Sequence, residues 1–107
     1  MKLILAIVSN DDSSAVNSNL TSHGYMVTRL STTGGFLKSG NTTFIIGTDD
    51  DKVENVIELI KEESSRRTEV IPANAAYDII QMGTYPIEIQ VGGATIFVMN
   101  VEQFVKA

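Results

Sequence analysis

Aliphatic and alternating stretches predict the strands of this chain. Lys2–Val8 is almost wholly aliphatic, which is typical of a strand that is covered on both faces or paired on both sides. Tyr25–Ser31 alternates between two usable faces, and Asn41–Thr48 is rich in Thr, Phe and Ile. Ile87–Val91 alternates apolar with polar residues, and Ala94–Met99 is a final apolar run. We therefore predict five strands, of which the second and third pair as a hairpin.

Two stretches have helical spacing. Ser13–His23 carries a weak apolar stripe between a Ser-Asn-Asp-Asp cap and a stop at Gly24. A second helix, the clearest in the sequence, is indicated by apolar residues at Val53, Val56, Ile57 and Ile60. Asp49–Asp51 suit its positive N-terminal end, whereas Arg66 and Arg67 suit its C-terminal end. We interpret the acidic triplet as a helix cap, with a metal site as the alternative.

Loops and turns are predicted for the remaining segments. Thr32–Gly40 is a glycine-rich loop, and Thr68–Tyr85 begins as a strand and continues as a long loop. Val101–Val105 is predicted as a short helical turn. The resulting order is β-α-β-β-α-β with a terminal strand extension. Two helices on one antiparallel sheet are the ferredoxin-like pattern, so we expect a single α+β sandwich domain over residues 1–107.

The composition excludes several classes of protein. The 107 residues contain no cysteine and one histidine, which excludes disulfides, thiolate zinc, cysteine nucleophiles and a multi-histidine metal site within one subunit. A net charge of −5 argues against a surface for DNA or RNA. The longest apolar run, Leu3–Val8, is too short for a membrane span or a signal peptide. We therefore expect a cytoplasmic protein with no membrane insertion and no metal.

Charged side chains along the sequence form no catalytic constellation. His23 has no nucleophile arranged with it and is expected to be a partly exposed capping residue at a helix end. Glu54, Glu58 and Glu62 lie four apart on one helix face, which indicates a solvated face and not an acid–base pair. Arg66-Arg67 could meet a phosphate, but we assign it to the helix end. The sequence predicts that the protein is not an enzyme.

The glycine-rich loop carries the most informative pattern. Gly34 and Gly35 leave backbone N–H groups open to a phosphate or a base edge, and Phe36 and Leu37 follow at the tip. Exposed apolar side chains pack against their own sheet, another subunit or a flat aromatic ligand. Two interpretations stay open: a hairpin loop packed at a subunit contact, or a ligand loop. A Walker A motif is excluded, because the Gly-Lys-Ser/Thr ending is missing.

Three further positions suit a ligand or a partner. The Asn41 amide can donate to and accept from a base edge at once. Gly47 leaves space for a ring to lie flat against a strand. Gly92-Gly93 is either a tight turn or bulge between strands, or a backbone kept bare for a partner's ring or strand.

These motifs resemble those of a known family. Thr32–Phe44 (TTGGFLKSGNTTF) and Val91–Val98 (VGGATIFV) are similar to the signatures of the PII-like cyclic di-AMP receptors of Gram-positive bacteria, and the similarity covers the whole chain. The resemblance implies a PII-like homotrimer with a short T-loop at about 33–41 and a long B-loop at about 67–85. It also implies one cyclic di-AMP in each intersubunit cleft, no cofactor, no catalytic activity, and signalling to an unidentified downstream protein through loop ordering.

Ligand contacts also follow from the resemblance. Thr28 and Asn41 match polar contacts to the base, and Gly47 matches a backbone contact. Phe97 matches an aromatic residue that lies against the ligand from the neighbouring chain. The remaining implied binding residues are Val27 and the loop segment Gly35, Phe36 and Leu37, which closes on an adenine.

Because the chain is acidic, a doubly negative ligand such as cyclic di-AMP needs positively charged groups close to it. The candidate cations near the implied site are Arg29, Lys38 and Lys106. Backbone N–H groups of the glycine-rich loop could supply further donors without a formal charge.

The chain departs from the family pattern at three positions. Gly24 replaces an amide that contacts the ligand, Met26 replaces a basic residue near it, and Lys106 stands where a glutamine often occurs. Each lost contact would weaken binding by up to about two decades. The alternative function is therefore a trimeric PII-like interaction protein with weak, altered or lost nucleotide binding.

Overall fold

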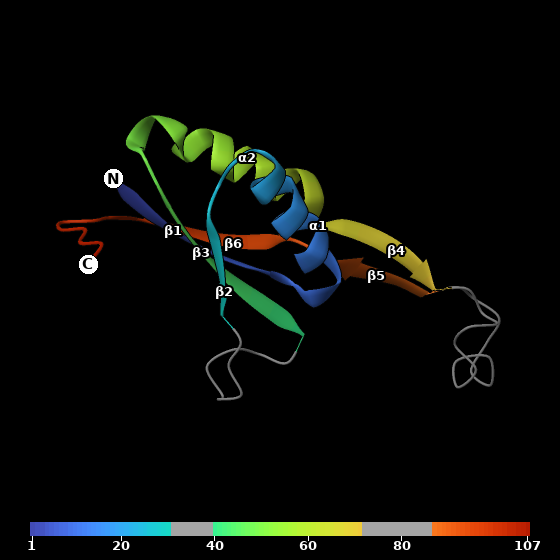
Figure 1. Cartoon of the computed structure of the whole chain (residues 1–107). Helices are drawn as coiled ribbons and strands as arrows, with labels where there is room; N and C mark the ends of the chain where they lie inside the picture. The colour runs from blue at the N-terminus through green and yellow to red at the C-terminus, as the bar shows by residue number, and fades with distance from the viewer. Residues whose placement is uncertain (31–39, 72–86) are drawn as a thin grey trace.

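The structure combines a four-stranded antiparallel sheet with two helices packed on one of its faces (Figure 1). It is a computed structural model that describes residues 1–30, 40–71 and 87–107. The elements of this body are β1 (Lys2–Ser9), α1 (Asn10–Ser22), β2 (Val27–Leu30), β3 (Asn41–Thr48), α2 (Val53–Ser64) and β6 (Ala94–Asn100). Across the sheet the strands lie in the order β2-β3-β1-β6. This is the predicted ferredoxin-like arrangement.

Two further strands form a hairpin that projects beyond the four-stranded sheet (Figure 1). β4 (Arg67–Ile71) pairs antiparallel with β5 (Ile87–Val91). The predicted strand Ile87–Val91 therefore lies outside the sandwich, and β6 is the sandwich's last strand and not a terminal extension. The pairing joins Arg67 to Val91, far apart in sequence, so local patterning could not reveal it. Residues 72–86, which hold most of the predicted long loop, lie outside the described part of the chain.

The hydrophobic core lies between the sheet and the helices. Alternate residues of β1 and β3 point at the helices and are buried, because successive side chains on a strand face opposite sides. The buried apolar side chains are Ile4, Ala6, Val8, Phe44 and Ile46 from the sheet, and Val16, Leu20, Val56, Leu59 and Ile60 from the helices. None of the helices in the described residues is long and apolar enough to cross a membrane.

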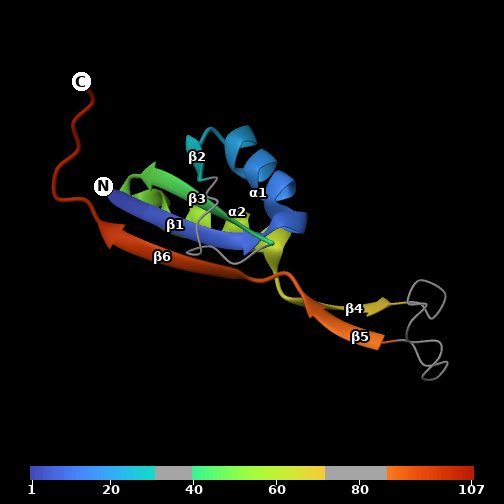
Figure 2. The same cartoon turned by 90° about the horizontal axis from the view of Figure 1, so that it is seen from below.

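The other side of the sheet, which we call the open face, carries no helix in the described part of the chain (Figure 2). The strand register defines its rows: Leu5 lies opposite Ile45 on one side and Phe97 on the other. Leu3 similarly lies between Gly47 and Met99. The side chains of this face include Thr28, Leu30, Asn41, Thr43, Ile45, Leu3, Leu5, Ile7, Thr95, Phe97 and Met99.

Helix α1 is capped from within the predicted Ser-Asn-Asp-Asp cluster and ends at the predicted glycine, but it begins at Asn10 and not at Ser13. The Ser9 hydroxyl accepts a hydrogen bond from the backbone N–H of Asp11 at 3.3 Å. His23 is the exposed C-cap, with Nδ1 2.7 Å from the carbonyl oxygen of Asn19. Gly24 follows with φ +88°, a conformation that ends the helix and favours glycine.

The acidic triplet does not cap α2 in the predicted way. Asp50–Lys52 forms a separate 3-10 turn before the helix, and the N-cap of α2 is Lys52, with no side-chain cap hydrogen bond. Asp50 instead lies 3.0 Å from the α-amino group of Met1. This hydrogen bond, together with the positive charge, lowers the pKa of Asp50. Asp50 therefore pairs with the amino group of the residue before β1, and not with the N-terminal end of α2.

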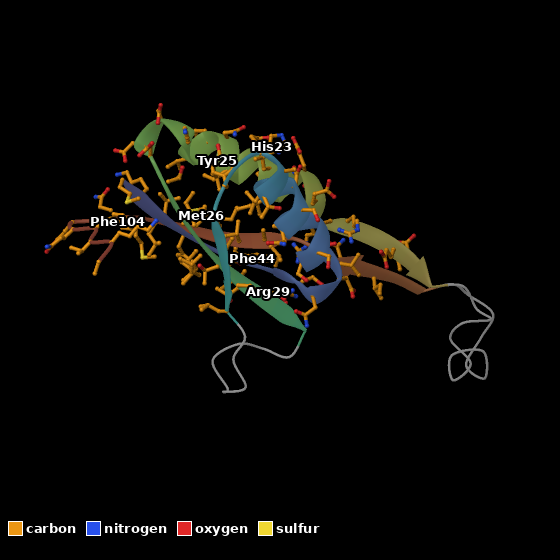
Figure 3. The ribbon with its side chains drawn as sticks, viewed as in Figure 1. His23, Tyr25, Met26, Arg29, Phe44 and Phe104 are labelled. Carbon is orange, nitrogen blue, oxygen red and sulfur yellow. The ribbon has the colours of Figure 1, made fainter. Side chains whose placement is uncertain are left out.

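The predicted helical turn over Val101–Val105 is absent. The chain there is irregular and exposed, and Figure 3 shows Phe104 on this tail beyond β6. The backbone N–H of Val101 donates to the carbonyl oxygen of Met1 at 3.3 Å. This bond extends the pairing of β6 with β1 by one residue and competes with a helical turn.

Candidate functional site

Most of the described binding residues implied by the sequence lie on the open face. Thr28 on β2, Asn41 and Gly47 on β3, and Phe97 on β6 are all exposed there. Val27 has the opposite orientation and is half-buried against the core. The loop residues Gly35, Phe36 and Leu37 lie outside the described residues.

Residues on this face are spread over its full width and length. Thr28 and Phe97 belong to one cross-strand row but sit on the two opposite edge strands. Three strand spacings separate these edges, which is about 14 Å. Asn41 and Gly47 lie six residues apart on β3, which is about 20 Å. A single chain therefore does not bring Thr28 and Phe97 together.

A cleft of about 630 Å³ lies next to Asn41. Its walls come from the C-terminal end of α2, the turn between β5 and β6, and the adjoining ends of β1 and β3. Lys61 and Arg66 line it together with Gly92 and Gly93. The cleft thus combines an amide, two basic side chains and a turn of two glycines.

Lys61 and Arg66 were not recognised as neighbours of Asn41 from the sequence. Lys61 Nζ lies 3.5 Å from Glu58, and both side chains are more than half exposed, so this ion pair is weak. Arg66 makes no ion pair within the described ranges. The feature of the sequence that could have indicated this cationic site is the basic pair directly after the second helix, which is assigned to the helix end from the sequence alone.

Arg29, the first of the predicted cations, is directed elsewhere. Its Nη2 donates to the Ser13 hydroxyl at 3.0 Å, and Figure 3 shows it beside the start of α1. It therefore points to the helix side of β2 and away from Thr28. Lys106 lies on the exposed tail, and Lys38 lies outside the described residues.

Arg67 forms the best-defined ion pair of the described residues. Its Nη2 lies 2.8 Å from Oδ1 of Asp12, a carboxylate that is 5% exposed in the first turn of α1. The hydrogen bond and the charge of Asp12 raise the pKa of Arg67. Its Nη1 also donates to the carbonyl oxygen of Ser65, the C-cap of α2, at 3.3 Å, so Arg67 reaches the helix end as predicted. It fastens the base of the β4–β5 hairpin to α1 beside the cleft.

Gly92 is packed against this ion pair. Gly92 and Gly93 have φ of +80° and +94°, which confirms the predicted tight turn between strands. A Cβ at Gly92 would lie 2.6 Å from Nη1 of Arg67 and 2.8 Å from the carbonyl oxygen of Ser65. The groups packed against Gly92 therefore belong to the same chain and not to a partner.

Asn41 is held in place through the start of α1. The backbone N–H of Asn10 donates to the carbonyl oxygen of Gly40 at 2.8 Å. The hydroxyl of Thr42 donates to Oδ1 of Asn10. These two bonds flank Asn41, so the strand end that carries it is fixed before any ligand binds.

The departures at Gly24 and Met26 have different local causes. Gly24 has the positive φ that the helix end requires, and no atom lies within 4 Å of its missing side chain. Met26 is 81% exposed at the start of β2, where Figure 3 shows it on the strand's outer side. Neither position supplies a charge or an amide to the open face.

The described residues contain no group of three or more acidic or histidine side chains that could hold a metal ion.

A family model described as "Cyclic-di-AMP receptor" matches residues 1–107. A solved structure titled as a functionally unknown protein from Pediococcus pentosaceus ATCC 25745 is 40% identical in sequence. The match covers 99% of this chain and 96% of that one, with a TM-score of 0.78.

Proposed function

Because the chain belongs to the cyclic-di-AMP receptor family, we propose that it is a signal-transduction receptor that binds cyclic di-AMP between the subunits of a homotrimer. Membership of a receptor family indicates a binding protein rather than an enzyme. In this proposal the ligand orders the segment between β4 and β5, and the change is read by a downstream protein.

The positions of Thr28 and Phe97 on the sheet support a binding site between subunits. Thr28 and Phe97 share the open face but lie on its opposite edges, so a Phe97 that lies beside Thr28 would come from another copy of the chain. The face between them is apolar, with Leu5, Ile45 and Met99 among its side chains. A second copy packed on this face would bury it and would complete the site at the same time.

The cleft next to Asn41 supplies charge for the ligand's phosphates. The chain has a net charge of −5, and cyclic di-AMP carries two phosphate charges, so binding needs local cations. Lys61 and Arg66 are positioned for this role in the cleft. The backbone N–H of Gly93 is not a further donor to the phosphates, because it bonds to the carbonyl oxygen of Ser64.

Calorimetric titration with cyclic di-AMP tests the proposal, with cyclic di-GMP and ATP as controls. We expect binding of cyclic di-AMP alone, at one ligand per chain, with a trimer observed by light scattering. An absence of heat at high protein concentration would favour the alternative, a trimeric interaction protein without nucleotide binding.

Asn41→Ala tests the base contact. We expect about ten- to a hundredfold weaker binding, because the ligand's polar edge would lose its partner in a site closed to water. Asn55→Ala is the matched control, since Asn55 is exposed on α2 and bonds to the Tyr25 hydroxyl at 2.7 Å. Equal affinities of the two variants would remove Asn41 from the site.

Arg66→Gln tests the phosphate contact. We expect about fivefold weaker binding at low salt and a flatter dependence of affinity on salt concentration, because one cation that faces the ligand is lost. Arg29→Gln is the control, because its guanidinium is occupied by Ser13 on the helix side. If Arg29→Gln weakened binding more than Arg66→Gln, the phosphates would lie nearer β2 than the cleft.

A further inference from the structure

Thr43 is the one buried side chain that the described strands place on the open face. On β3 the residues that point at the helices are all buried, whereas Asn41 and Gly47 on the other face are exposed. Thr43 belongs to the open face by alternation and by its pairing opposite Ile7 and Leu30. It is nevertheless only 3% exposed.

The hydroxyl of Thr43 has no hydrogen-bond partner among the described residues, although it is fully buried. A buried hydroxyl without a partner destabilises a folded chain, because it has lost its bonds to water. The adjacent Thr42 shows the usual arrangement, since its hydroxyl donates to Asn10. Valine would fill the same volume at position 43 without this cost, so a ligand that offers the hydroxyl a hydrogen-bond partner would remove a cost that the described residues leave.

The position of Thr43 indicates which partner this is. Thr43 lies two residues from Asn41 on the same face of β3, and it is the diagonal neighbour of Thr28, which pairs with Ile45. It therefore stands between the two polar residues that the sequence implies for contact with the base. The side chains opposite Thr43, those of Ile7 and Leu30, are only half-buried.

We propose that Thr43 is a further specificity-determining residue, whose hydroxyl forms a hydrogen bond with the polar edge of an adenine. This inference rests on the proposed function, because it takes the adenine of cyclic di-AMP as the partner. A hydroxyl can donate and accept, so it can pair with the amino group or with a ring nitrogen of the base. Binding then satisfies a group that the unliganded chain leaves unsatisfied, which adds selectivity for a base with a matching edge.

Thr43→Val tests this contact, because it removes the hydroxyl and keeps the shape. We expect about tenfold weaker binding of cyclic di-AMP, with the melting temperature of the free protein unchanged or raised. Thr43→Ser, which retains the hydroxyl, is expected to bind within about threefold of the unmodified protein. The control Thr21→Val removes a hydroxyl that donates within α1, to the carbonyl oxygen of Asn17 at 2.8 Å, and should leave the affinity nearly unchanged.

The outcomes separate this inference from the proposed function. If the unmodified protein binds cyclic di-AMP and Thr43→Val binds equally well, the assignment of Thr43 is overturned and the receptor function stands. If the unmodified protein does not bind cyclic di-AMP at all, both fall. A Thr43→Val variant that loses stability together with affinity would also overturn the inference, because the hydroxyl would then have a structural partner.

Discussion

Gly92→Ala is expected to lower the free energy of unfolding by about 3 kcal/mol. The positive φ of Gly92 costs any other residue roughly 1–2 kcal/mol. Overpacking adds about 1–3 kcal/mol, because the new Cβ would lie 2.8 Å from the backbone oxygen of Ser65, which cannot move independently. The same Cβ would displace Arg67 from the buried carboxylate of Asp12.

Thermal and urea unfolding at a fixed protein concentration measure this effect, which should lower the melting temperature by about 15 °C. Gly24→Ala is the matched control. Gly24 also has a positive φ, at +88°, but no atom lies within 4 Å of its missing side chain. It should therefore lose only the strain energy, about 1 kcal/mol. Equal losses in the two variants would show that Gly92 serves conformation alone and that Arg67 does not require it.

Local patterns were sufficient for the body of the fold. The strand Asn41–Thr48 and the end of α1 at Gly24 lie where the sequence predicts them, because side-chain alternation and a glycine stop act over a few residues. The β4–β5 hairpin was missed as a unit because its pairing links distant residues. The ion pair of Arg67 was also missed, since its partner Asp12 lies 55 residues away and belongs to another element.

The candidate site likewise contains residues that local sequence patterns indicate and residues that only the tertiary fold brings together. The residue types of Asn41 and Gly47 indicated a base contact, and strand alternation places both on one face. The basic side chains beside Asn41 could not be predicted, because Lys61 and Arg66 reach the cleft only through the packing of α2 against the β5–β6 turn. Thr43 was missed for a different reason: its hydroxyl is unusual only by its burial, which the sequence does not report.

Phe97→Glu is expected to abolish both assembly and ligand binding. Phe97 is 53% exposed on the outermost strand of the open face, and in the proposed trimer a neighbouring chain covers it. Burying an unpaired carboxylate there would cost several kcal/mol, and the cost would recur at each of the equivalent interfaces. We expect a monomer at concentrations where the unmodified protein is a trimer. Affinity for cyclic di-AMP should fall by at least about a hundredfold.

Val98→Glu distinguishes this interface from a general effect of added charge. Val98 is the next residue on β6 and has a similar exposure, but it lies opposite Ile4 and so points to the helix side of the sheet. Light scattering and calorimetry should therefore find Val98→Glu trimeric and able to bind. Should Phe97→Glu assemble and bind as well, the open face is not the contact between subunits. The division of the site between Thr28 of one copy and Phe97 of another would then fail, because Phe97 of one copy would not lie against the next copy.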